Sequence, residues 1–83
     1  FFRVMPDLAG EVGSPSDSRK DLRDKAFQYL DAGVPNVWLF EPRWRTISWI
    51  GPDRVERVYR EGDVLDGGDL IPGFRLAVSD VFK

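Results

Sequence analysis

Three charged side chains, Asp7, Glu11 and Lys25, have the types and spacing that metal or acid–base chemistry requires. Asp7 and Glu11 are four residues apart in a segment that reads as a strand, so both carboxylates point to one face of it. If that face is covered, two acids there need a function, because burying unpaired charge is costly. If the face meets solvent, the pair is ordinary. The spacing leaves both interpretations open.

These two acids alone cannot hold a single metal ion on a straight strand. Four steps of extended chain separate Asp7 from Glu11 by about 13 Å. The ligand oxygens of one ion lie within ~2–2.6 Å of it. Unless the chain bends at Pro6-Asp7, a second ligand must therefore come from elsewhere.

The composition excludes several kinds of site. The 83 residues contain no histidine and no cysteine, which excludes a Ser-His-Asp triad, a thiolate nucleophile and a His or Cys metal site in this chain. Carboxylates without imidazoles favour a hard ion such as magnesium. The lack of cysteine is consistent with a reducing cytoplasm. No apolar run approaches the roughly 20 residues of a membrane helix.

The net charge of −2 is a mild argument against strong non-specific binding of nucleic acid, which depends on Lys and Arg contacts to phosphates. Basic residues nevertheless gather in two stretches of the chain. Each stretch is either an ordinary solvated face or a set of phosphate contacts. The first contains Arg19, Lys20 and Arg23, and the second Arg43, Arg45, Arg54, Arg57 and Arg60.

The segment from Ser18 to about Ala32 predicts an amphipathic helix. Ser18 and Asp21 form a capping-box pattern at its start, and Gly33 is suited to end it. On a helical wheel Lys25 falls at the edge of the apolar stripe. It either pairs with Asp21 on the surface or reaches around to the acidic face of the strand, and both fit the spacing.

A mixed sheet is predicted around this helix. Residues 8–12 and the apolar run 36–40 read as strands, and with the helix between them they form a βαβ unit of parallel neighbours. A hairpin over residues 46–50 and 54–59 follows around Gly51-Pro52-Asp53. The fold class is therefore α/β.

The strand over residues 8–12 needs a partner on its other side, and only seven residues precede it. An uncovered, partly apolar edge invites pairing with another chain. We therefore expect either a second copy of the chain, making a homo-oligomer, or a missing N-terminal half to cover this edge.

Several motifs together resemble the Uma family of putative restriction endonucleases, in the PD-(D/E)xK nuclease superfamily. They are the stretch Pro6-Asp-Leu-Ala-Gly-Glu11-Val-Gly-Ser-Pro-Ser-Asp17, then Asp21-x-x-x-Lys25-x-x-x-Tyr29-Leu, then Gly33-Val-Pro-x-x-Trp38-Leu-Phe-Glu-Pro42. The closing Gly62-Asp-Val-Leu and Leu70-Ile-Pro-Gly-Phe-Arg-Leu are also similar to that family. The resemblance covers about residues 6–82.

The resemblance implies a restriction-endonuclease-like core and a metal-dependent endonuclease that cuts nucleic acid, in the first instance DNA. Glu11 and Asp7 would hold magnesium or manganese. Where the superfamily usually has lysine this chain has Gly13, and Lys25 on the following helix matches the displaced lysine. The family's other metal-binding Asp belongs to an upstream strand, so residues 1–83 are expected to form a single partial domain, the C-terminal portion of the fold.

Two other interpretations remain open. The chain could be a catalytically inactive member of the same fold that dimerises or holds nucleic acid. Gly10 favours this interpretation, because the family prefers a branched apolar residue there and glycine weakens a strand. The chain could also be an unrelated small α/β interaction domain. Metal binding would distinguish the active endonuclease from the inactive member of the same fold. The fold would distinguish both from an unrelated interaction domain.

Overall fold

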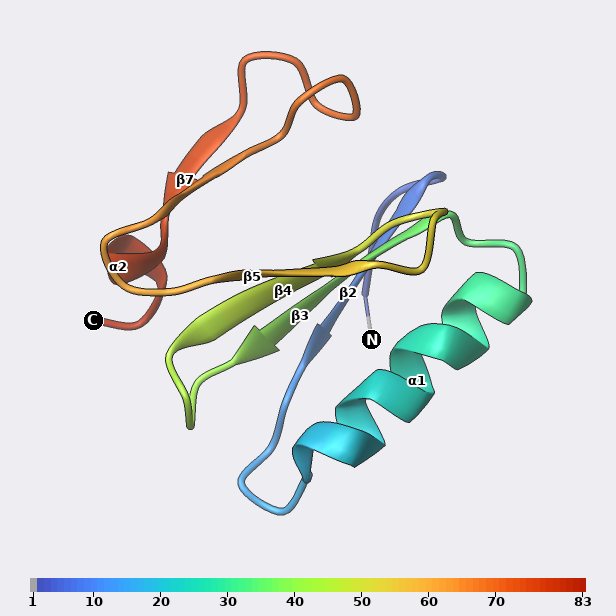
Figure 1. The fold of residues 1–83 in the computed structure, drawn as a ribbon, viewed down its shortest axis with the longest axis horizontal. Coiled ribbons are helices and arrows are strands. Elements are labelled where there is room, and N and C mark those ends of the chain that lie inside the picture. Colours follow the sequence, from blue (N-terminus) through green and yellow to red (C-terminus); the bar gives the residue numbers. More distant parts are fainter. Residues whose placement is uncertain (1) are drawn as a thin grey trace.

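The computed structural model describes residues 2–83 and contains a five-stranded mixed sheet with strand order β1-β2-β3-β4-β5 (Figure 1). A second sheet of two strands, β6 and β7, and two helices complete the fold. The bounds are β1 Phe2–Met5, β2 Leu8–Val12, α1 Arg19–Asp31, β3 Asn36–Glu41, β4 Thr46–Ile50, β5 Glu56–Tyr59, β6 Val64–Asp66, β7 Arg75–Ala77 and α2 Val78–Val81. Within these residues, neither helix has the length and apolar content to cross a membrane.

The βαβ unit is confirmed. β2 and β3 are parallel neighbours, with Leu8 opposite Asn36, and α1 connects them. Ser18 caps the helix as predicted: its hydroxyl accepts the backbone N–H of Asp21, whose carboxylate accepts the N–H of Ser18 in return. After the helix, Gly33 has a φ of +100°, a conformation that glycine adopts without strain.

The hairpin predicted after β3 is also confirmed. β3 pairs antiparallel with β4, and β4 pairs antiparallel with β5. β5 begins at Glu56, two residues later than expected, because Arg54 has a positive φ of 61° and belongs to the turn. The α/β fold class with a mixed sheet is therefore correct.

Each face of the sheet has its own core. On one face Leu22 and Ala26 of α1 pack against alternate residues of the central strands, namely Val37, Leu39 and Ile50. On the other face Leu8, Trp38 and Ile47 pack against the segment that contains β6, β7 and α2. Figure 1 shows α1 and the β6–β7 segment on opposite sides of the sheet. This two-sided burial explains the continuous apolar sequence of β3.

The expectation that the outer edge of β2 lacks a partner within this chain is wrong, whereas a homo-oligomer and a missing N-terminal half stay predictions. The chain turns at Pro6-Asp7, and β1 folds back to pair antiparallel with β2. Phe2 lies opposite Gly10, and its ring stacks on Phe40 with centroids 6.1 Å apart. A Cβ at Gly10 would come within 2.2 Å of the Phe2 ring, so glycine is required where this ring covers the strand.

Candidate active site

Glu11 lies near the end of β2 and faces α1. Its side chain is only 10% exposed. The strand alternates, so Leu8 belongs to the core on the opposite face, while Ala9 and Glu11 point toward the helix. A carboxylate buried to this extent needs partners, and two side chains of α1 provide them.

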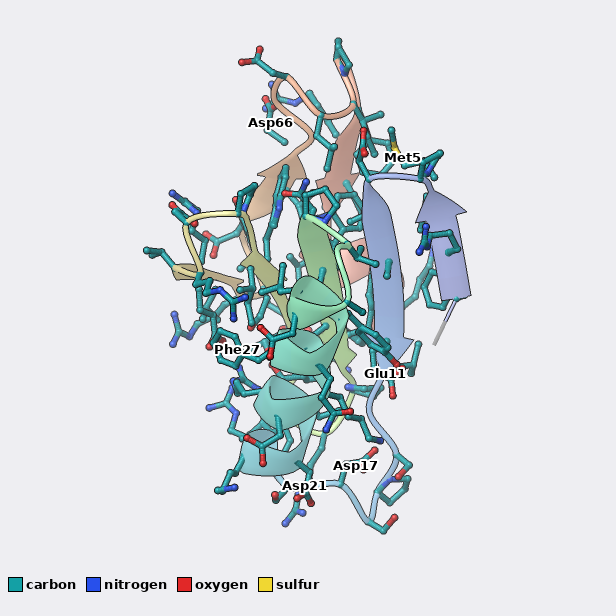
Figure 2. All side chains as sticks on the ribbon, turned by 90° about the vertical axis from the view of Figure 1, so that its right-hand side faces the viewer. Met5, Glu11, Asp17, Asp21, Phe27 and Asp66 are labelled. Carbon is teal, nitrogen blue, oxygen red and sulfur yellow. The ribbon has the colours of Figure 1, made fainter. Side chains whose placement is uncertain are left out.

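The first partner is Lys25. Its Nζ lies 3.4 Å from Glu11 Oε1 and 3.3 Å from Asp17 Oδ1, so one ammonium bridges two carboxylates. The predicted approach of Lys25 to Glu11 is therefore confirmed. The surface pair with Asp21 does not form, because the Asp21 carboxylate is occupied in the helix cap. Figure 2 shows Glu11 beside α1 and Asp17 in the loop below it.

The second partner is Tyr29, whose hydroxyl donates to Glu11 Oε2 at 3.3 Å. Burial raises the pKa of Tyr29, and the nearby negative charge of Glu11 raises it further. The phenol therefore stays protonated and remains a donor at neutral pH. Sequence reasoning placed Tyr29 in the helix motif of the family resemblance and gave it no role at the site. The available signal was its position one helical turn after Lys25, which places both side chains on the same face.

Asp17 is the residue that sequence reasoning missed as a site member. It lies in the loop between β2 and α1, where its carboxylate accepts the backbone N–H of Ser14 at 2.8 Å and the hydroxyl of Ser14 at 3.0 Å. These two bonds, with a smaller contribution from Lys25, lower its pKa below the ordinary value. Asp17 is thus a fixed anion at neutral pH.

We call Glu11, Asp17, Lys25 and Tyr29 the Lys25 cluster. The hydrogen bond to Asp17 raises the pKa of Lys25; burial opposes that rise, and the charge of Glu11 adds to it. The lysine is therefore a cation held between two anions. Its side chain is 41% exposed, so solvent and solutes reach it.

The Lys25 cluster fits magnesium better than a metal that needs a complete protein cage. Among residues 2–83, no three His, Cys, Asp or Glu side chains gather closely enough to hold an ion. Magnesium, however, is often bound through one or two carboxylates, with water and substrate phosphates as its other ligands. Glu11 and Asp17 supply two such carboxylates.

The structure does not bring Asp7 to this cluster. Asp7 lies in the exposed turn between β1 and β2, at the opposite end of β2 from Glu11. Its backbone carbonyl accepts the side-chain amide of Asn36 at 3.1 Å. The chain therefore does not bend in the way that would unite Asp7 and Glu11 on one ion.

A second ionic group, the Arg23 cluster, lies on the same face of the sheet. Arg23 donates to both oxygens of Glu41, at 2.8 and 3.1 Å, and also to Glu56 and Ser48. Glu41 is fully buried and accepts further bonds from Thr46 and Ser48. Sequence reasoning left Arg23 as either a solvated basic residue or a phosphate contact and used Glu41 only as a strand end, so it missed this cluster.

Burial opposes ionisation in the Arg23 cluster, but hydrogen bonds outweigh it. For Arg23, burial lowers the pKa, and the bonds to Glu41 and Glu56 raise it above the ordinary value overall. For Glu56, burial raises the pKa, and the bonds from Arg23 and Ser48 lower it overall. Both groups are therefore charged at neutral pH.

Comparison with known proteins identifies the relatives of this chain. The model of the Uma2 family, described as a putative restriction endonuclease, matches residues 1–79. A putative nuclease of the DUF820 group from Anabaena variabilis ATCC 29413, solved as a crystal structure, has a similar fold with a TM-score of 0.76 and 22% sequence identity. The match covers 98% of this chain and 46% of that one, so this chain spans about half of its length. No curated protein matches the chain.

Proposed function

Because the chain belongs to the Uma2 family of putative restriction endonucleases, we propose that it carries the cutting centre of a metal-dependent endonuclease of the PD-(D/E)xK type, acting on DNA. The observation that carries the proposal is the Lys25 cluster, in which one ammonium meets two carboxylates at the end of β2. The carboxylate of Glu11 is nearly buried and contacts both a lysine and a phenol, unlike the partners of an exposed surface ion pair.

In the proposed mechanism Glu11 and Asp17 hold magnesium or manganese. When bound there, such an ion would supply Lewis-acid chemistry toward the phosphate and the attacking water. Lys25 positions the attacking water or stabilises the negative charge that develops on the phosphate oxygens. Tyr29 fixes the orientation of Glu11 through its hydroxyl. Asp7 has no part in this proposal because it lies at the other end of the strand.

The structure weakens one argument for an inactive relative. Gly10, which departs from the pattern of the family, provides room for the Phe2 ring on the far side of the strand from Glu11. Its presence is therefore explained by packing. An inactive, DNA-holding module is the alternative that the following experiment distinguishes.

The test combines plasmid cutting with metal binding. The parent chain should nick supercoiled DNA with magnesium or manganese and not with EDTA. Glu11→Gln should lose both cutting and metal affinity measured by titration calorimetry. Lys25→Ala should lose roughly 10²–10³-fold in cutting rate while its metal affinity and its circular dichroism spectrum stay those of the parent.

Lys20→Ala is the matched control. Lys20 is on the same helix and pairs with Asp24, but its side chain is 82% exposed and has no ion pair with Glu11 or Asp17. This variant should cut DNA like the parent. Equal loss in the Lys20 and Lys25 variants would contradict the assignment, and metal binding without any cutting by the parent would support the inactive module.

A further inference from the structure

A pocket of about 680 Å³ lies beside the Lys25 cluster. It is bounded by the loop that follows β2, by the turn that follows β3, and by Leu22 at the start of α1. Figure 1 shows that the ends of β2 and β3 and the first turn of α1 lie at the same end of the molecule. The volume is in the range of small-ligand sites.

One loop joins the pocket to the proposed cutting centre. Gly13 and Ser14 line the pocket, and the N–H of Gly13 is anchored to the carbonyl of Phe40 at 2.8 Å. The amide of Ser14 is bonded to Asp17, which pairs with Lys25. The same loop therefore lines the pocket and carries Asp17 to the Lys25 cluster.

Trp44 forms one wall of the pocket and is held in position by its turn. The N–H of Trp44 donates to the carbonyl of Glu41, and the next N–H donates to Pro42. Two guanidinium groups lie over its ring: the Cζ of Arg19 is 4.8 Å from the ring centroid, and the Cζ of Arg43 is 5.2 Å from it. A half-buried indole with cations on its faces is a surface on which another flat group can stack.

The two arginines differ in their freedom to move. Arg19 donates to the buried Glu41 at 3.5 Å. Arg43 is exposed, and within residues 2–83 it has no acidic partner at ion-pair distance. Arg43 is therefore available to an anionic ligand, whereas Arg19, at the start of α1, is already bonded to Glu41 of β3.

We infer that this pocket binds one unpaired nucleotide of the DNA strand, with its base stacked on Trp44 and its phosphate paired with Arg43. The inference rests on the proposed function. Apolar walls from Pro15, Leu22 and Pro42 suit the flat faces of a base, and the cation at the rim suits a phosphate. The base must be unpaired, because neighbouring pairs cover the faces of a base in a duplex. The pocket would hold the strand next to the phosphate that is cut.

Binding without metal tests the inference separately from cutting. The probes are a fluorescein-labelled dT12 strand and a strand of twelve abasic nucleotides, which has the same phosphates and no bases. Both are titrated in EDTA and followed by anisotropy. Trp44→Ala should weaken binding of dT12 roughly tenfold and leave binding of the abasic strand unchanged, whereas Trp44→Phe should restore most of the loss.

Arg43→Ala should weaken both strands and lower the slope of log Kd against log salt by about 0.7, the value for one phosphate contact on a single strand. Arg75→Ala is the matched control, because Arg75 is exposed on β7, a strand that contributes no residue to the pocket. This control should change the affinity for either strand, and the slope of log Kd against log salt, less than Arg43→Ala does.

The inference is overturned if the parent binds both strands equally, if it binds neither, or if Trp44→Ala weakens both to the same extent. Each of these results can occur with or without magnesium-dependent cutting of plasmid by the same preparation. Conversely, base-dependent binding in a chain that never cuts would support the pocket and contradict the proposed enzyme activity. The two proposals therefore fail separately.

Discussion

The Lys25 cluster and the Arg23 cluster lie on the same face of one sheet and have similar composition, yet they are built differently. In the Arg23 cluster the contacts to Glu41 are short and bidentate, and Glu41 has no exposed surface. In the Lys25 cluster the lysine contacts are 3.3 and 3.4 Å and the lysine is 41% exposed. The carboxylate of the first cluster is fully enclosed, whereas the cation of the second cluster is open to solvent.

This difference separates a structural ion cluster from a chemical one. Removing one member of a buried, fully paired cluster leaves an uncompensated charge, which is strongly destabilising. Removing a half-exposed lysine lets water replace it. Variants of the Arg23 cluster should therefore lose mainly stability, whereas variants of the Lys25 cluster should lose mainly activity.

The largest effect on stability is expected for Arg23→Ala. It leaves Glu41 buried and without its bidentate partner, so the free energy of unfolding should fall by about 3–5 kcal/mol. Urea denaturation followed by tryptophan fluorescence measures the change. If the free energy of unfolding falls no further than it does in the exposed Lys20→Ala variant, the Arg23 cluster does not stabilise the fold more than an exposed ion pair does.

The next effect is a dependence of stability on pH that belongs to Glu56. Its pKa is lowered in the folded protein, so the ionised form stabilises the fold at pH values above the ordinary glutamate pKa of about 4.3. That stabilisation is lost as the pH falls through the lower folded value. The melting temperature of the parent should drop below about pH 4.

Glu56→Gln checks this assignment. The variant should be less stable than the parent at pH 7, and the two melting temperatures should converge as the pH falls toward 3. A constant difference between them across this range would mean that another carboxylate causes the acid loss.

The smallest effect on stability is expected for Lys25→Met. The methionine keeps most of the aliphatic length and removes the charge, and solvent can take over the exposed part of its contacts. Its urea midpoint should match that of Lys20→Ala. A Lys25 variant as unstable as Arg23→Ala would erase the distinction between the clusters and leave Lys25 with a structural role only.

The parts of the fold that follow local rules were predictable. The cap formed by Ser18 and Asp21, the end at Gly33 and the buried strand β3 depend on residue type and spacing, and all three are present. The parallel pairing of β2 and β3 follows from that order of elements. The periods of a strand and a helix allowed Glu11 and Lys25 to face each other, and the family resemblance favoured that alternative.

The other features depend on tertiary contacts, which the periodicity of a strand or a helix does not predict. Asp17 comes from a loop, and only the folded path of that loop brings it to Lys25. Arg23 and Lys25 are two residues apart with similar character, so the sequence does not say which of them is buried. The short strand β1 was missed because its partner Gly10 has no side chain to complete an alternating pattern with Phe2.

The parallel pairing of β2 with β3 also determines when the Lys25 cluster can assemble during folding. The antiparallel pairs β1–β2 and β3–β4 close short loops, whereas β2 and β3 meet only after the whole segment containing α1 has been looped out. Such long-range closure costs more entropy and slows folding. Glu11 lies on β2 and Lys25 on the helix that connects β2 to β3, so a partly folded chain in which this helix has not packed on the sheet has no Lys25 cluster. Closure of the βαβ unit and assembly of the Lys25 cluster are thus coupled in a single event.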